Sequence, residues 1–220
     1  MVFSGLRGLD LDRVVQIIDN KNMQKQLEHQ GNKLPIIGKS PADLEFEVFH
    51  NNKIDKKKLS SYREKWLILF FYPADFTFVC PTELEEMADN YKKFQELGAE
   101  IVSVSTDTAF VHKAWHDNSP AIKKIRFPMA ADPTGALSRE FGVYIDNEGL
   151  ALRGSFVLNP KGELSFFEVN NNDIGRSASE LVRKLEAAIF VNTHPGQVCP
   201  AGWTPGKKTL KPGVDLVGKI

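Results

Sequence analysis

A continuous apolar run, followed by a helix-like segment and a second apolar run, restricts the fold of this chain more than any other feature. The run WLILFFY (66–72) has the length of a strand and lacks alternation, which is typical of a strand buried on both faces of a sheet. From Thr82 to Leu97 apolar residues recur at helical spacing and Gly98 follows, so a helix is predicted over that range. The segment EIVSVS (100–105) predicts another buried strand. Two parallel strands need a crossover connection, and the sequence therefore predicts a βαβ unit.

The remaining patterns place further strands and helices around this unit. A strand is predicted at 44–49, a polar connection at 51–65, and helices at 110–116 and 136–141. The turn NPKG (159–162) between two apolar segments predicts a β-hairpin. Ser177, with Glu180 three residues later, predicts a capping box at the start of the last helix. This order predicts an α/β protein with a thioredoxin-like fold, in which helices flank a central mixed sheet.

The composition divides the chain into three regions. Residues 1–32 form an N-terminal extension, in which Leu11, Val14 and Ile18 predict a short amphipathic helix. Residues 33–191 carry the strand and helix patterns and are predicted to form the thioredoxin-like domain. Residues 192–220 are rich in Pro, Gly and Lys and have no periodicity, which indicates a C-terminal arm.

Charge and cysteine content argue against several classes of function. Lys+Arg and Asp+Glu both number 28, so the chain lacks the basic excess of a nucleic-acid or membrane-surface binder. No apolar stretch approaches the ~20 residues that a membrane span needs, and the first residues lack the pattern of a secretory signal. Two cysteines without such a signal indicate a reducing compartment, where a functional cysteine is redox-active or metal-bound. We therefore expect a cytoplasmic protein.

Cys80 stands where the first buried strand has ended and the helix begins. The unpaired N–H groups at a helix N-terminus favour an anion, so a thiolate there is stabilised and nucleophilic. Pro81 suits the first helical position, Thr77 is placed to offer a hydroxyl to the same pocket, and Pro73 is placed to cover it. The alternative is that Cys80 is a small apolar residue at a strand–helix junction. The four residues together favour the functional interpretation.

Two other constellations carry weaker signals. His112 and His116 have a spacing that suits a metal on a helix, but HKAWH lacks the glutamate of a zinc protease and no third ligand stands nearby. We therefore interpret them as surface or partly packed side chains. A dyad of Cys80 with a distant histidine is open, although none of the local signatures of cysteine proteases is present. Phosphate loops and dinucleotide fingerprints are absent from the sequence, and we expect neither a metal nor a cofactor.

The segment FFYPADFTFVCPTELEEMADNY (70–91) resembles the active-site segment of typical two-cysteine peroxiredoxins, with Pro73, Thr77 and Cys80 at the spacing of their signature. The resemblance covers the chain from about residue 34 to its end, and it is closest to the bacterial alkyl hydroperoxide reductase C subfamily. It continues through VSVSTDT, HKAWHDNS, DPTGALSREFGV, EGLALRGSFVLNPKG, HPGQVCPAGW and DLVGKI.

The resemblance implies a role for each of these residues. Cys80 would attack the O–O bond of a hydroperoxide and become a sulfenic acid, while Thr77 hydrogen-bonds the peroxide or the thiolate. Arg153, in ALRGSF, would stabilise the developing charge, and Glu83 would orient Arg153. The alternatives are that Arg153 is a surface residue on a strand, and that Glu83 is an acid favoured by the helix dipole.

Cys199, in the arm, would act as a resolving cysteine. The resemblance implies that it forms a disulfide with Cys80 of a partner subunit, which requires at least a dimer, and it suggests a ring of five dimers. A disulfide reductase, either thioredoxin or a flavoprotein, would then restore both thiols. The alternatives are an unused thiol at Cys199, a ring-forming holdase or redox relay, and a disulfide oxidoreductase without peroxidase activity. Pro73, Thr77 and Cys80 together with Arg153 distinguish a peroxidase from these.

Overall fold

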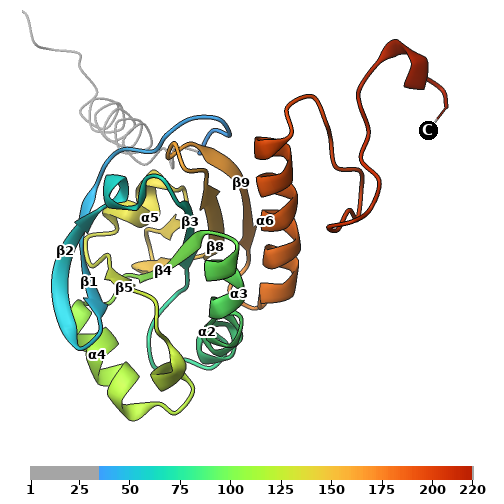
Figure 1. Cartoon of the computed structure of the whole chain (residues 1–220). Coiled ribbons are helices and arrows are strands. Elements are labelled where there is room, and N and C mark those ends of the chain that lie inside the picture. The colour runs from blue at the N-terminus through green and yellow to red at the C-terminus, as the bar shows by residue number, and fades with distance from the viewer. Residues whose placement is uncertain (1–34, 220) are drawn as a thin grey trace, which may run out of the picture.

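The computed structural model of the chain describes residues 35–219, which are built around a mixed sheet of seven strands in the order β2-β1-β5-β4-β3-β8-β9 (Figure 1). Strands β3, β4 and β5 run parallel to one another, and the remaining neighbours pair antiparallel. The bounds are β1 Glu45–His50, β2 Lys53–Lys58, β3 Trp66–Phe71, β4 Ala99–Ser105, β5 Met129–Ala131, β8 Arg153–Leu158 and β9 Leu164–Asn170, with a separate small hairpin of β6 Tyr144–Ile145 and β7 Leu150–Ala151.

Helices cover both faces of this sheet. The α-helices are α2 Cys80–Asp89, α3 Tyr91–Glu96, α4 Ala109–Asn118, α5 Ala136–Glu140 and α6 Ala178–Thr193, and the 3-10 helices are η1 Leu59–Tyr62, η2 Ile122–Lys124 and η3 Val214–Leu216. Within residues 35–219 no helix has the length and apolar character needed to cross a membrane. The seven-stranded sheet and the helices on its two faces confirm the predicted mixed sheet with flanking helices for the part of the chain that the structure describes.

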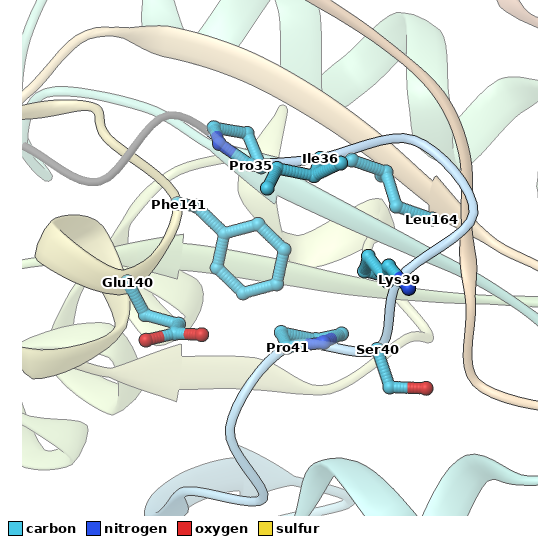
Figure 2. Close-up of a pocket in the computed structure, with 8 residues that line it drawn as sticks. All are labelled: Pro35, Ile36, Lys39, Ser40, Pro41, Glu140, Phe141 and Leu164. Carbon is cyan, nitrogen blue, oxygen red and sulfur yellow. The ribbon is translucent and has the colours of Figure 1, made fainter.

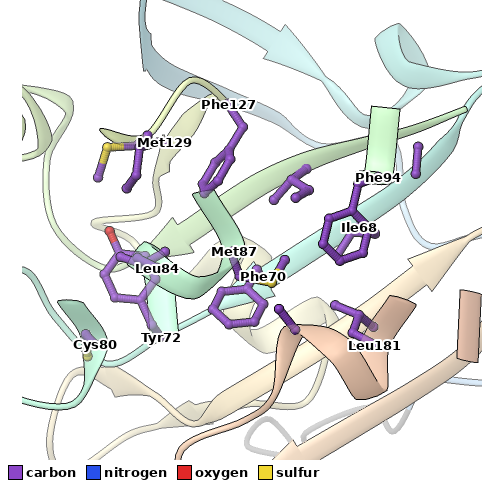
Figure 3. Close-up of a cluster of buried hydrophobic side chains, with 14 of the residues drawn as sticks. Ile68, Phe70, Tyr72, Cys80, Leu84, Met87, Phe94, Phe127, Met129 and Leu181 are labelled. Atoms are coloured by element: carbon purple, nitrogen blue, oxygen red, sulfur yellow. The ribbon is translucent and has the colours of Figure 1, made fainter. Parts of the chain in front are cut away.

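Strand β3 lies in the middle of the sheet and is buried along its whole length. Alternate side chains point to opposite faces, because the side-chain period of a strand is two. Ile68 and Phe70 face a core cluster that also receives side chains from α2, α3, α4 and α6. Leu67 and Leu69 face a second cluster, covered by α5 and the segment around β7. Cys80 belongs to the first cluster (Figure 3), so β3 and α2 place it at the edge of the core.

The βαβ unit is confirmed, but its helix is not continuous. The chain forms α2 and α3 with a break at Asn90, whose side-chain amide donates to the Glu86 carbonyl at 2.9 Å. Such side-chain bonds to the backbone compete with helical continuation. The apolar face persists across the break, since Leu84 and Phe94 are both fully buried. Gly98 ends α3 with φ of 72°, a conformation that glycine adopts without strain.

Two strands of the seven-stranded sheet, β2 and β5, were not predicted. The segment 51–65 is not merely a polar connection, because β2 pairs with β1 along its whole length. Four of its six residues are lysines, which are typical of a sheet edge that is protected from pairing with other chains. The short strand β5 lies inside the segment between the helices predicted at 110–116 and 136–141, where only three residues pair with β4. Runs of that length give no periodic signal.

The predicted capping box at the start of α6 is wrong. Ser177 is the N-cap residue, but its side chain makes no capping bond to the helix. The carboxylate of Glu86 on α2 accepts instead from the Ala178 N–H at 3.1 Å. A glutamate from a neighbouring helix thus satisfies an unpaired N–H group and adds favourable negative charge there.

The C-terminal arm follows α6 and extends away from the body of the molecule (Figure 1). It is anchored by Trp203, which is 3% exposed and packs on Phe190 of α6 with the ring centroids 4.9 Å apart. An isolated bridge pairs Val198 with Leu210 within the arm. The predicted N-terminal extension lies outside the described residues, and the three-region division stays a prediction.

Candidate active site

Cys80 is the first residue of α2, and its side chain is fully buried. The chain leaves β3 at Phe71 and reaches this helix through a loop of eight residues, 72–79. Pro81 is the second residue of the helix, one position later than predicted, and its missing N–H group still removes no helical hydrogen bond. The sulfur therefore sits at the positive end of a helix of ten residues.

Arg153 and Glu83 meet at this cysteine. Arg153 begins β8, and its Nη1 donates to Cys80 Sγ at 3.4 Å and to Glu83 Oε2 at 2.6 Å. Its Nε donates to the Asn172 carbonyl at 2.9 Å, which fixes the plane of the guanidinium. Both charged side chains are almost completely buried, at 4% and 2% exposure. Arg153 is therefore not a surface residue, and Glu83 does more than respond to the helix dipole.

Arg176, which no sequence pattern indicated, completes the cluster. Its Nε and its backbone N–H donate to Glu83 Oε1 at 2.9 and 2.8 Å, and its Nη2 donates to Oε2 at 3.1 Å. Its Nη1 donates to the Gly154 carbonyl at 2.7 Å, and the guanidinium lies 3.5 Å from the centre of the Phe70 ring. One buried carboxylate thus holds two buried guanidinium groups beside the sulfur.

The cluster shifts the pKa values of its own members. Burial alone would raise the pKa of Glu83, but the hydrogen bonds and charge of Arg176, together with the charge of Arg153, outweigh burial and lower it. Burial lowers the pKa of Arg176. Burial also acts to lower the pKa of Arg153, but its contacts with Cys80 and Glu83 raise it overall. Glu83 is therefore a carboxylate, and Arg153 keeps its positive charge against the sulfur.

The loop before α2 brings the other two predicted residues to this region. Pro73 is buried, and Thr77 is partly buried three residues before Cys80. The Thr77 hydroxyl donates its proton to the Ala74 carbonyl at 2.9 Å, which leaves the oxygen lone pairs available as acceptors. Phe76 lies between them with φ of 54° and packs on Trp115 with the ring centroids 5.9 Å apart.

Cys199 does not contact Cys80 in this chain. Both cysteines are free thiols. Cys199 lies against α6, with its sulfur 3.9 Å from the Ala187 carbonyl, and it lines a groove of about 650 Å³ between α6 and β9. Burial raises the pKa of the Cys199 thiol. The two cysteines thus occupy different environments, one at a helix start with an arginine and the other in the arm.

Other parts of the described chain show no competing centre. The cavity in Figure 2 has a volume of about 290 Å³ and contains no cysteine, and it is lined by Pro35, Ile36, Lys39, Ser40, Pro41, Glu140, Phe141 and Leu164. Residues 35–219 hold no group of three or more potential ligands arranged for a metal ion. His112 is fully buried, which corrects its interpretation as a surface or partly packed side chain, whereas His116 is partly exposed as expected.

The sequence profile of the AhpC/TSA family matches residues 37–167, more than half of the chain. The chain belongs to this family. A second profile, the C-terminal domain of 1-Cys peroxiredoxin, matches residues 190–219, which include Cys199 and all of the arm but its last residue. The predicted family and enzyme class, a peroxiredoxin with thiol peroxidase activity, are confirmed.

Individual relatives agree with the profiles. The chain is 50% identical to alkyl hydroperoxide reductase C of Pseudomonas aeruginosa over 85% of this chain and all of that protein, and 51% identical to the Salmonella typhimurium protein of the same name over 79% and 93%. The crystal structure of Enterococcus faecalis AhpC matches 76% of this chain with a TM-score of 0.74 and 47% identity. The reduced 2-Cys peroxiredoxin of Plasmodium vivax matches 81% with a TM-score of 0.78 and 31% identity. The predicted thioredoxin-like fold is thereby confirmed.

Proposed function

We propose that this peroxiredoxin reduces hydrogen peroxide and organic hydroperoxides through Cys80, in antioxidant defence and redox homeostasis. The observation that carries the proposal is the 3.4 Å contact of Cys80 Sγ with Arg153 Nη1 at the start of α2. A fixed positive charge and free helical N–H groups both favour a thiolate, which is the nucleophilic form of cysteine.

The first step transfers one oxygen atom. The Cys80 thiolate attacks one peroxide oxygen, an S–O bond forms, and the O–O bond breaks. The second oxygen leaves with the electron pair of the broken bond and takes a proton, giving water or an alcohol, while Cys80 becomes a sulfenic acid. Arg153 stands where it can stabilise the negative charge that develops on the leaving oxygen.

Thr77 and Pro73 would position the peroxide. The Thr77 hydroxyl has its proton engaged on Ala74, so toward a peroxide it acts as an acceptor for the O–H group. Pro73 has no N–H group and is buried at the start of the loop, so it excludes water without adding a competing donor. Glu83 holds the Arg153 guanidinium in place through its 2.6 Å contact.

The second step would form a disulfide between subunits. The Cys199 thiol of one subunit condenses with the Cys80 sulfenic acid of its partner, an S–S bond forms, and water leaves. An external reductant, either thioredoxin or a flavoprotein reductase, then supplies two electrons and two protons to restore both thiols. Cys199 lies against α6, but the arm continues away from the domain beyond it (Figure 1), so a movement that lifts Cys199 off α6 would carry it toward a partner subunit.

The exposed surfaces support a dimer that assembles further into a ring of five dimers. Strand β9 is an edge of the sheet and exposes Phe167 and Val169, each at 39%, so a second β9 could pair with it. Phe76, Phe78 and Phe110 are exposed at 58%, 92% and 73%, which supports a second apolar contact between dimers. We place the enzyme in the cytoplasm, which keeps thiols reduced, and we retain the division into an extension, a peroxidase domain and an arm.

The test compares hydroperoxide consumption by the wild type, Cys80→Ser and Cys199→Ser with a recycling reductant, alongside a non-reducing gel. Cys80→Ser should be inactive. Cys199→Ser should consume about one equivalent of peroxide and form no intersubunit disulfide. Peroxide consumption by Cys80→Ser at the wild-type rate would refute the proposal, and a disulfide oxidoreductase or a holdase would consume none in any variant.

The assembly can be tested separately by light scattering of the reduced protein. Phe78→Asp adds a charge to the exposed aromatic surface and should leave dimers in place of rings. Val169→Asp, on the edge strand, should give monomers. A monomeric wild type at micromolar concentration would contradict the proposed exchange between subunits.

A further inference from the structure

We propose that Asp75, held by Tyr72, His112 and Asp107, is a positioning residue for the hydroperoxide: it fixes the peptide unit that orients the Thr77 hydroxyl. The inference rests on the proposed function. It assigns a role to a buried polar network (Tyr72, Asp75, His112 and Asp107) that lies behind the loop and outside the cluster of Arg153, Glu83 and Arg176.

The Asp75 carboxylate is enclosed by two donors. Tyr72 donates from its hydroxyl to Oδ1 at 2.7 Å, and Nδ1 of His112 lies 2.8 Å from Oδ2. The side chains of Asp75 and His112 are both completely buried. Burial and the nearby Asp75 hold the pKa of Tyr72 well above its usual value, so Tyr72 stays a donor. Tyr72 from the start of the loop and His112 from α4 thus meet at the Asp75 side chain.

His112 has an acceptor at each ring nitrogen. Its Nε2 lies 3.1 Å from the Ala130 carbonyl, which can only accept, so Nε2 carries a proton. One further proton lies between Nδ1 and Asp75 Oδ2. It makes either an ion pair or a neutral pair, and in both cases every polar atom of the pair is satisfied. A buried pair of this kind tolerates little displacement, because a lost partner leaves an unpaired polar group.

The network reaches Thr77 through a single peptide unit. The Asp75 N–H donates to Asp107 Oδ2 at 2.8 Å, while the Ala74 carbonyl of the same planar unit accepts from Thr77 at 2.9 Å. Asp107 is itself held by the Ser105 hydroxyl at 2.7 Å. Fixing the N–H end of this unit therefore fixes the carbonyl end, and with it the direction in which the Thr77 lone pairs point.

The loop needs such an anchor because its backbone is strained at the next residue. Phe76 has φ of 54°, a left-handed conformation that a bulky side chain rarely adopts. Strained residues of this kind persist only where the surrounding contacts fix them, and they concentrate at functional sites. The Phe76 ring is 58% exposed, so its own burial contributes little to holding the turn. The bonds of Asp75 on one side and Thr77 on the other enclose this strained position.

A matched pair of variants separates positioning from simple stability. In His112→Asn the amide nitrogen can take the place of Nδ1 and keep the bond to Asp75, while the bond to Ala130 is lost. In His112→Gln the amide nitrogen can take the place of Nε2 and keep the bond to Ala130, while the bond to Asp75 is lost. Each variant loses one buried hydrogen bond, so a purely structural role predicts that the loss of activity in each variant follows its loss of thermal midpoint.

Two reactions of Cys80 are measured for each variant: the second-order rate with hydrogen peroxide and the alkylation rate with iodoacetamide. Alkylation needs the thiolate but not a positioned peroxide. We expect His112→Gln to lower the peroxide rate about 10- to 100-fold, the loss typical of a reactant misplaced by a remote change, while alkylation stays near wild type. His112→Asn should lose distinctly less. Equal peroxide rates in the two variants, or parallel losses in both reactions, would overturn the inference.

Asp107 provides a second route if His112→Gln does not fold, because Asp107 is only partly buried. Asp107→Ala removes the acceptor for the Asp75 N–H and should show the same selective loss of peroxide reactivity. Asp107→Asn keeps an acceptor oxygen and should recover most of it, and equal rates in the two would again overturn the inference. Wild type and Cys80→Ser are run in parallel. A wild type that does not consume peroxide contradicts the proposed function itself, whereas an active wild type with unselective variants contradicts only the positioning role.

Discussion

Replacing Glu83 with glutamine should destabilise this protein more than the exchange of any other carboxylate on α2 for its amide. Glu83 Oε1 accepts from the Arg176 N–H and Nε, and Oε2 accepts from Arg153 Nη1 and Arg176 Nη2, so four hydrogen bonds converge on the carboxylate. A glutamine offers one acceptor oxygen, and its NH₂ group would face two donors. The variant therefore loses two of the four bonds and the carboxylate charge that balances Arg153 and Arg176.

The expected magnitude follows from these losses. A hydrogen bond to a charged group contributes about 1.5–3 kcal/mol, which gives roughly 3–6 kcal/mol for two. Removal of one partner from a buried ion pair independently suggests about 3–5 kcal/mol. We therefore expect Glu83→Gln to lower the free energy of unfolding by about 4 kcal/mol. The peroxide rate should fall as well, because the Arg153 guanidinium loses the contact that orients it.

The assay is urea unfolding of the reduced protein at neutral pH, followed by circular dichroism at one protein concentration, because assembly makes stability depend on concentration. Glu85→Gln is the matched control: it lies on the same helix, but its partner Lys124 is 48% exposed, and surface pairs contribute little. A difference between the two variants of less than about 1 kcal/mol, the size of an ordinary substitution, would refute the reasoning.

Three further predictions concern Arg153, the anchor of the arm at Trp203, and the ionisation of Glu83. Arg153→Lys should lower the rate of the Cys80 reaction with hydrogen peroxide about 100-fold, which is the effect of removing an oriented donor. The reason is that one ammonium group cannot span Cys80, Glu83 and the Asn172 carbonyl. Stopped-flow rates within about twofold of wild type would contradict this prediction. Trp203→Ala should speed tryptic cleavage after Lys207 while the thermal midpoint of the domain stays unchanged, since Trp203 anchors only the arm; unchanged cleavage would count against the anchor. Because the pKa of Glu83 is lowered by folding, its contribution to stability is present above its usual value of 4.5 and is lost as the pH falls through the lowered pKa. The stability gap between wild type and Glu83→Gln should therefore narrow in acid urea titrations, and a constant gap would argue against this ionisation.

The sequence predicted the elements whose signals are local. The run from Trp66 to Tyr72 identified the central strand because burial on both faces removes every polar residue from it. The strand–helix junction located Cys80, whereas Glu83 was assigned through the family resemblance. Strand β2 was not predicted, because the lysines that protect a sheet edge give it the composition of a polar loop. The break at Asn90 was not predicted either, because the apolar period continues across it.

Long-range polar partners could not be predicted from local patterns. Arg153 was assigned only through the family motif. Arg176 stands in the polar segment NNNDIGRSAS (170–179), which has the composition of a surface loop, and its burial becomes evident only when Glu83 and Phe70 are placed beside it. His112 was interpreted as a surface or partly packed histidine for the same reason, because its partner Asp75 lies on another element. Buried charges need partners, but a sequence does not state which ones.

Under the proposed chemistry, the cluster at Cys80 also determines where the helix must open. A disulfide requires the two Cα atoms to lie within about 7 Å, yet the Cys80 side chain has no exposed surface, so the sulfur must leave the core before it can meet Cys199. Adding an oxygen to a fully enclosed sulfur crowds the site and favours opening after oxidation rather than before it. Three residues further on, Glu83 is bound to Arg153 and Arg176, which hold the helix from that point. The opening is therefore confined to the first turn of α2: the residues that activate the thiolate also limit how much of the helix has to unfold.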